Sequence, residues 1–174
     1  MKKIKKWILL FIVAAIPIAG IWAAKNPKIL VEAFVDLGGL KKGDIFPTIS
    51  GHDVEGTPLS FDLFKGKKYI VMMGKIDCGV CQSSYPTLEK WKERYPDIPF
   101  VMVGKGGKEE YAKVKQKHHF QFPILDADEE IQAALKMKVF PVFYVVDQSG
   151  KVAKRMNGFN ADEFNDLIKK VREL

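Results

Sequence analysis

Acidic residues are missing from the N-terminal part of this chain. Residues 1–28 contain six lysines and no acidic side chain. The remaining residues carry 22 basic and 21 acidic side chains, so the net charge of +7 belongs almost entirely to the N-terminus. A nucleic-acid-binding domain would need a basic stripe on its folded part. We therefore expect no nucleic-acid partner.

Cysteine is scarce as well. The chain has two, Cys78 and Cys81, and therefore lacks a second Cys-x-x-Cys motif. A metal site would have to recruit His118 and His119, and adjacent histidines rarely bind the same ion. We expect no metal ion. The chain also lacks internal repeats and low-complexity tracts, and its 47% hydrophobic content predicts a packed core.

Charge is absent from Trp7 to Ala24, a run of 18 mostly apolar residues. A membrane span needs about 20. Tryptophans stand at both ends of the run, and the four lysines before it place the N-terminus in the cytoplasm. No cysteine follows the run, which excludes a lipoprotein anchor. We predict that residues 1–25 anchor the protein in the cell membrane by a single pass, with the remainder extracytoplasmic. The alternative is a cleaved signal peptide and a secreted protein, but Trp22 occupies a position that should be small.

After this segment, residues 26–42 have helical spacing that ends at Gly38-Gly39, and we interpret them as a juxtamembrane helix or linker. Residues 43–174 form the globular domain. It begins with a predicted β-hairpin around the Glu55-Gly56 turn, formed by Phe46–Gly51 and Pro58–Phe61. Strands are predicted at residues 69–73, 100–103, 142–146 and 151–156, with an extended segment at 121–125. Helices are predicted after the cysteines, at 108–119, at 128–136 and from Asn160 or Asp162 to the end.

The two cysteines follow an apolar strand and open a helix. Residues three apart on one helical face have Cβ atoms about 5–6 Å apart, so the pair can close a disulfide with little backbone movement. The helix N-terminus favours a thiolate at Cys78, while Cys81 lies one turn inside. This predicts Cys78 as the nucleophile and Cys81 as the resolving thiol. A static disulfide remains an alternative, although so short a loop restrains little chain entropy.

Together these motifs resemble the thioredoxin superfamily and, within it, the membrane-anchored TlpA/ResA-like proteins. The resemblance covers residues 43–174. It rests on Cys78-Gly79-Val80-Cys81 after an apolar strand, on Pro86 five residues after the second cysteine, and on the segment from Val139 to Gly150 around Pro141. It implies an α/β thioredoxin-like three-layer fold, with a central mixed sheet flanked by helices and an added N-terminal β-hairpin. It further implies that Pro141 is a cis-proline facing the two sulfurs.

The sequence departs from this pattern beside the cysteines. Asp77 occupies a position that is commonly tryptophan, and Met72 and Ser84 stand where the family keeps acidic residues. Lys75 and Asp77 are the remaining candidates for pKa tuning: Lys75 would stabilise the Cys78 thiolate and Asp77 would oppose it. Phe140, a bulky residue before the cis-proline position, would narrow the substrate groove.

The leading hypothesis is an anchored extracytoplasmic oxidoreductase that exchanges disulfides with protein substrates. It needs no cofactor beyond the Cys78–Cys81 disulfide, and a membrane-embedded electron donor would suit its topology as a redox partner. The Gly79-Val80 dipeptide lacks a histidine, which favours reductase or cytochrome-maturation duty. One alternative is a peroxiredoxin-like peroxidase, which would want a threonine shortly before a lone cysteine, and none precedes Cys78. The other is a non-catalytic, membrane-tethered binding module.

Overall fold

The computed structural model describes residues 24–25 and 35–174. The predicted membrane anchor and the first part of the predicted juxtamembrane helix lie outside these residues, apart from Ala24 and Lys25. In the described part of the chain, no helix is long and apolar enough to cross a membrane. Residues 35–37, which were expected to form the last turn of the juxtamembrane helix, have no regular secondary structure. Gly38 and Gly39, at which this helix was expected to end, both have positive φ, which is costly for residues other than glycine.

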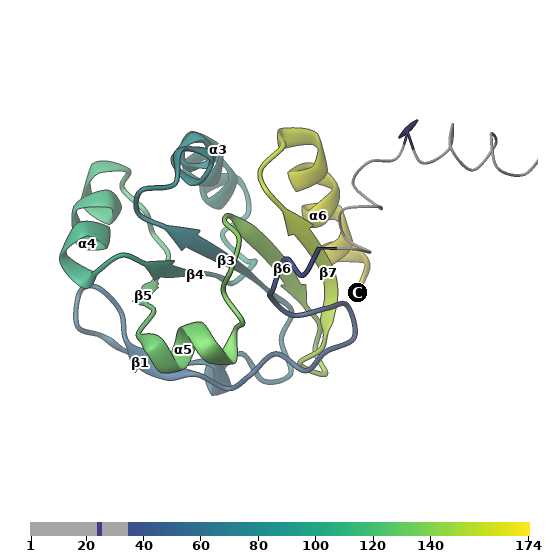
Figure 1. Cartoon of the computed structure of the whole chain (residues 1–174), viewed down its shortest axis with the longest axis horizontal. Coiled ribbons are helices and arrows are strands. Elements are labelled where there is room, and N and C mark those ends of the chain that lie inside the picture. The colour runs from purple at the N-terminus through teal and green to yellow at the C-terminus, as the bar shows by residue number, and fades with distance from the viewer. Residues whose placement is uncertain (1–23, 26–34) are drawn as a thin grey trace, which may run out of the picture. The chain divides into compact units, whose positions relative to one another are not determined.

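The domain is built on a five-stranded mixed sheet with the order β5-β4-β3-β6-β7 (Figure 1). Three strands are parallel: β3 (Tyr69–Lys75), β4 (Phe100–Lys105) and β5 (Ile124–Asp126). On the other side of β3, β6 (Val142–Val146) and β7 (Val152–Asn157) pair antiparallel. Strands β3 and β6 are buried along nearly their whole length, which explains their continuous apolar sequences.

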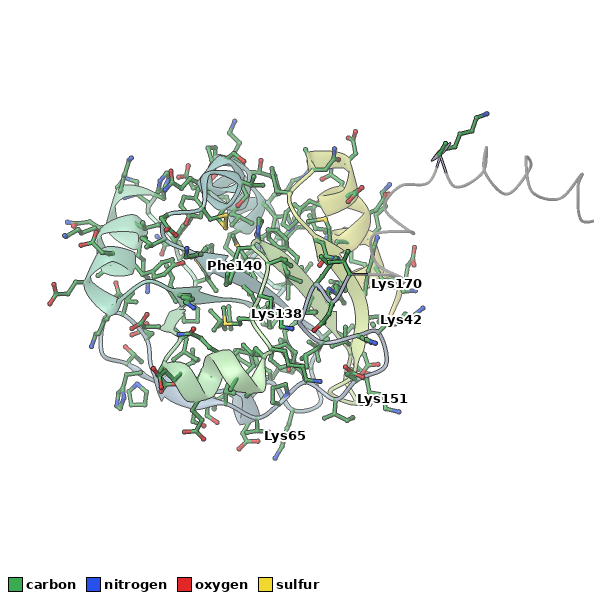
Figure 2. All side chains as sticks on the ribbon, viewed as in Figure 1. Lys42, Lys65, Lys138, Phe140, Lys151 and Lys170 are labelled. Atoms are coloured by element: carbon green, nitrogen blue, oxygen red, sulfur yellow. A yellow bond between two sulfur atoms is a disulfide. The ribbon has the colours of Figure 1, made fainter. Side chains whose placement is uncertain are left out.

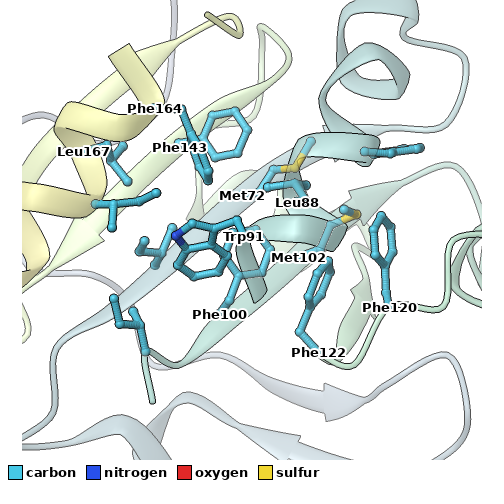
Figure 3. Packing of buried hydrophobic residues seen from close by; sticks show 14 of the residues in the cluster. Met72, Leu88, Trp91, Phe100, Met102, Phe120, Phe122, Phe143, Phe164 and Leu167 are labelled. Carbon is cyan, nitrogen blue, oxygen red and sulfur yellow. The ribbon is translucent and has the colours of Figure 1, made fainter. Parts of the chain in front are cut away.

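Helices cover both faces of the sheet (Figure 1). One face carries α3 (Gly79–Arg94), α4 (Lys108–Lys117) and α6 (Ala161–Glu173). We call this the cysteine face, because Cys81 belongs to its core. Figure 3 shows its aromatic packing, in which the rings of Phe100 and Phe122 lie 4.5 Å apart. The opposite face, which we call the far face, carries α5 (Glu129–Ala134). The predicted α/β architecture with a central mixed sheet between helices is therefore confirmed.

The N-terminal hairpin is present but shorter than expected. Its strands are β1 (Ser50–His52) and β2 (Pro58–Ser60), and the 3₁₀-helix η1 (Phe61–Phe64) follows. The predicted strand from Phe46 to Ile49 does not form. Instead, the Phe46 N–H donates to the Gly150 carbonyl at 2.8 Å, and the side chain is buried in the far face. Packing of this segment on the sheet thus replaces strand pairing.

The described domain starts slightly before the expected residue 43. Contacts divide the chain into Met1–Leu37 and Gly38–Leu174. Leu40 is buried, and its backbone N–H donates to the Tyr144 hydroxyl at 3.0 Å. Gly39 is needed at its position, because a Cβ there would lie almost on that hydroxyl. These contacts fasten residues 38–40 to the far face of the sheet.

Candidate active site

The site lies at one end of the sheet, where β3 runs out and β6 begins. Met73 near the end of β3 pairs with Val142 at the start of β6. The residues just beyond the two strands, the cysteine turn after β3 and Phe140-Pro141 before β6, therefore leave the sheet at the same end. The topology brings these two segments together although they are about 60 residues apart in the chain.

Cys78 is the N-cap of α3. Its extended backbone (φ −94°, ψ 106°) lets its Sγ atom accept a hydrogen bond from the Cys81 N–H at 3.1 Å. A sulfur at this position faces the free N–H groups and the positive end of the helix dipole, both of which favour thiolate. The helix N-terminus thus supplies the stabilisation that a nucleophilic thiol requires.

The two cysteines form a disulfide, with their Cα atoms 5.2 Å apart. Their exposure differs: Cys78 is half-buried, whereas Cys81 is fully buried in the core of the cysteine face. This asymmetry suits a pair in which a substrate reaches one sulfur and the second attacks from behind. The assignment of Cys78 as the nucleophile and Cys81 as the resolving thiol stays a prediction.

The Phe140–Pro141 peptide bond is cis. Pro141 is buried, and its carbonyl accepts a hydrogen bond from the Gly158 N–H at 2.8 Å. Phe140, labelled in Figure 2, is partly buried and packs on the same core cluster as Cys78. The structure thus places Phe140 on the cysteine face, and both Phe140 and Pro141 at the end of the sheet that carries the cysteine turn.

Lys75 and Asp77, the two candidates for tuning, are paired with each other. The Lys75 Nζ atom lies 3.0 Å from the carboxylate of Asp77, and both side chains are substantially exposed. The hydrogen bond from Lys75 lowers the pKa of the Asp77 carboxyl. Because the pair is close to neutral, neither charge acts on Cys78 without opposition from the other, and the helix N-terminus is left as the main local source of thiolate stabilisation.

The positions of the two missing acids are fully buried. Met72 lies in β3 between Met102 of β4 and Phe143 of β6. Ser84 lies in α3, and its hydroxyl donates to the Cys81 carbonyl at 2.6 Å. Both positions are therefore occupied by uncharged side chains that fit the core.

Sequence patterns did not single out Tyr85 and Tyr111, which are fully buried in the same core cluster as Cys81. Tyr111 lies in a charged helix and gave no periodic signal. The one signal available was a pair of glycines, Gly74 and Gly104, which stand opposite each other in β3 and β4 and make room for the Tyr111 ring.

His118, one of the two histidines considered as metal ligands, contacts other side chains. The His118 Nδ1 atom lies 2.6 Å from the Glu89 carboxylate, and its ring packs on Tyr85 and Phe120. Within the described residues, no group of three or more His, Cys, Asp or Glu side chains is arranged to hold a metal ion.

A Cys-x-x-Cys pair at the start of α3 and a cis-proline before β6, on a mixed sheet with helices on both faces, define the class of thioredoxin-like thiol–disulfide oxidoreductases. The family model described as Redoxin matches residues 41–170, and the chain belongs to this family. Cys78 and Cys81 occupy its active-site position.

Individual relatives agree with this assignment. The thioredoxin-like protein YneN of Bacillus subtilis is 26% identical over 120 residues, covering 66% of this chain and 70% of YneN. A thiol:disulfide interchange protein from Chlorobium tepidum superposes with a TM-score of 0.67 at 22% identity, covering 76% of this chain and 98% of that one. A secreted Mycobacterium tuberculosis disulfide oxidoreductase homologous to E. coli DsbE gives a TM-score of 0.64 at 21% identity, covering 72% and 96%. At these identities the solved structures establish the fold.

Proposed function

We propose that this protein is a membrane-anchored, extracytoplasmic reductase of protein disulfides. The observation that carries the exchange chemistry is the disulfide between the partly exposed Cys78, at the N-terminus of α3, and the fully buried Cys81. Support for the location comes from the uncharged run between Trp7 and Ala24 behind four lysines. An oxidising compartment is also where substrate disulfides persist.

In the reductive direction the dithiol form reacts. The Cys78 thiolate attacks one sulfur of a substrate disulfide, and the substrate S–S bond breaks as the Cys78–substrate bond forms. The displaced substrate sulfur takes a proton from water. Cys81 then loses its proton to water, and its thiolate attacks the Cys78 sulfur. The Cys78–Cys81 bond forms, and the second substrate sulfur leaves with the electron pair and is protonated.

Two features favour reduction over strong oxidation. The dipeptide between the cysteines, Gly79-Val80, contributes no cation, and the charge of Lys75 is opposed by Asp77. A strongly oxidising pair needs a reduced form that is unusually stabilised, and the nearby side chains provide no such stabilisation. A membrane-embedded dithiol donor, acting by the same exchange in reverse, would return Cys78 and Cys81 to the reduced state.

Trapping the intermediate tests the exchange reaction. A Cys81→Ala variant of the full chain should accumulate disulfide-linked adducts through Cys78, visible on non-reducing gels and lost on reduction. The wild type should reduce insulin. A Cys78→Ala variant, which keeps Cys81, should neither form adducts nor reduce insulin. Absence of both adducts and insulin reduction would refute the enzyme assignment. The reduction potential of the couple, measured against glutathione, decides the direction: a value near that of the strong oxidants, about −120 mV, would overturn the reductase proposal.

A further inference from the structure

In the core cluster that contains Cys81, two tyrosine hydroxyls are buried without a hydrogen-bond partner in the described part of the chain. The side chains of Tyr85 and Tyr111 are 1% and 0% exposed, and neither hydroxyl finds a partner among the residues that the structure describes. A buried unpaired hydroxyl costs about 1–3 kcal/mol. Phenylalanine would fill either position without this cost, so the two hydroxyls call for a functional explanation.

Tyr111 is held by a slot in the sheet. Its ring lies against Gly104, where an added Cβ would overlap the ring carbons at 2.3 Å. Its hydroxyl lies over Gly74, at 3.5 Å from the position of a Cβ there. Gly74 pairs with Gly104 across β3 and β4, and it precedes Cys78 by only four residues. The slot therefore holds this hydroxyl over the end of β3 that leads into the cysteine turn.

Tyr85 approaches the cysteines from α3 itself. It follows Cys81 by four residues, so the two side chains lie on one face of the helix. Long helical side chains lean toward the helix N-terminus, which is the direction in which Cys81 lies. The Tyr85 ring itself packs edge-on against His118 and Phe120. The Tyr85 phenol also lies close enough to Tyr111 to oppose ionisation of the Tyr111 hydroxyl and so raise its pKa.

The titratable groups around this pair leave both phenols neutral. Burial raises the pKa of Tyr85 and of Tyr111, and Asp126 and Asp77 raise that of Tyr111 further. Asp77 is itself paired with Lys75. On the Tyr85 side, the neighbouring titratable group is the His118 ring, which is bound to Glu89. Both hydroxyls are therefore protonated donors at neutral pH.

We propose that Tyr85 and Tyr111 are positioning residues whose hydroxyls donate hydrogen bonds to the sulfur of Cys81 when the disulfide is open. This inference rests on the proposed exchange function and concerns its resolving step. Cys81 must release its proton to water before its electron pair can form the bond to Cys78 and displace the substrate sulfur. In an apolar core that ionisation is unfavourable. Two neutral donors stabilise the thiolate without bringing another charge into the core.

The test titrates Cys81 directly. In the Cys78→Ala protein, thiolate absorbance near 240 nm reports ionisation of Cys81, with the Cys78→Ala/Cys81→Ala protein as the blank. Adding Tyr111→Phe or Tyr85→Phe should move the midpoint up by about one pH unit, because a hydrogen bond to a charged group is lost. In the protein with both cysteines, each substitution should prolong the mixed disulfide about tenfold. The matched control is Tyr69→Phe, which removes the hydroxyl of a buried tyrosine on the far face and should change neither quantity.

A purely structural role gives a different result. Removing an unpaired hydroxyl would then leave or raise stability while the Cys81 midpoint stays where it was. An unchanged midpoint in both variants overturns the proposal, and either variant that folds is sufficient to decide it. Because the titration needs no substrate, it remains informative even if Cys81→Ala traps no adducts and the wild type does not reduce insulin, the two results that together would refute the exchange function instead.

Discussion

Buried tyrosine hydroxyls on the two faces of the sheet differ in their hydrogen bonding. On the far face, the Tyr144 hydroxyl accepts a hydrogen bond from the Leu40 N–H, and the Leu40 carbonyl in turn accepts one from Arg155 Nη1 at 3.2 Å. On the cysteine face, the hydroxyls of Tyr85 and Tyr111 have no such partners among the described residues. The same side chain thus ties down the N-terminal segment on one face and remains available beside a disulfide on the other.

This difference originates in strand alternation. Successive residues of a strand point to opposite faces, so Phe143 and Val145 of β6 join the cysteine face while Tyr144 joins the far face. The cysteine face contains the disulfide, whereas the far face holds the segment at Gly39 and Leu40, where the domain begins. Substituting the buried tyrosines should therefore separate effects on the disulfide from effects on the attachment of residues 38–40.

The largest effect is expected from filling the tyrosine slot. Gly104→Ala places a Cβ 2.3 Å from the Tyr111 ring, and neither the ring nor the buried strand has room to move. Overpacking of this kind costs about 1–3 kcal/mol, and a clash this close to a buried aromatic ring should reach the upper end. Urea unfolding followed by circular dichroism measures the loss.

Its matched control is the glycine on the neighbouring strand. Gly74→Ala adds the same methyl group, but its nearest neighbour is the Tyr111 hydroxyl at 3.5 Å, an ordinary contact. Gly74→Ala should therefore cost far less than Gly104→Ala. Equal losses in the two variants would show that the ring does not occupy the slot.

The sequence was sufficient for the elements whose signal is local. The apolar run of β3, the bounds of β6 and the polar N-caps of the later helices followed from composition and spacing. Asp128 caps α5 and Asn160 caps α6, both among the residues proposed for these roles. The cysteine pair at a helix start could be recognised for the same reason, because spacing along one helix fixes its geometry.

The rest depends on contacts between distant segments. Phe46 looks like a strand residue, yet its side chain is buried among Phe61, Tyr69 and Tyr144 while its backbone pairs with Gly150. Tyr111 is one aromatic residue in a charged helix, and its burial follows from the register of β3 and β4. The Lys75–Asp77 pairing, which cancels two predicted tuning charges, likewise becomes apparent only in three dimensions.

A smaller effect is expected when the tyrosine hydroxyls of the two faces are compared by the stability that each contributes. Tyr144→Phe leaves the Leu40 N–H without its acceptor, so about 1 kcal/mol of unfolding free energy should be lost. Tyr85→Phe removes a hydroxyl that has no partner to strand, so the stability should be unchanged or slightly higher. Urea midpoints of the two variants give the comparison directly. A loss in Tyr85→Phe as large as that in Tyr144→Phe would mean that the Tyr85 hydroxyl is bonded in the folded protein.

The smallest expected effect concerns the exposed pair beside Cys78. Asp77→Asn leaves Lys75 unopposed and should lower the pKa of the Cys78 thiol, whereas Lys75→Met leaves Asp77 unopposed and should raise it. The rate at which iodoacetamide alkylates Cys78 in the Cys81→Ala protein measures both changes. Each should be no more than about threefold, and both should fade as salt is added, because exposed charges are screened.

The Lys75–Asp77 pair should make the stability of the folded protein depend on pH in a defined direction. The pKa of Asp77 is lower in the folded protein than in the unfolded chain because Lys75 donates to it. The contribution of the pair to the stability of the folded protein is therefore fully present above the pKa of Asp77 in the unfolded chain. It is lost as the pH falls through the pKa of Asp77 in the folded protein. Asp77→Asn should abolish this acid-side dependence, and the Cys78 alkylation profiles of variant and wild type should converge once Asp77 is protonated. If the alkylation profiles of variant and wild type differ equally at every pH, Asp77 affects Cys78 through the conformation of the turn and not through its charge.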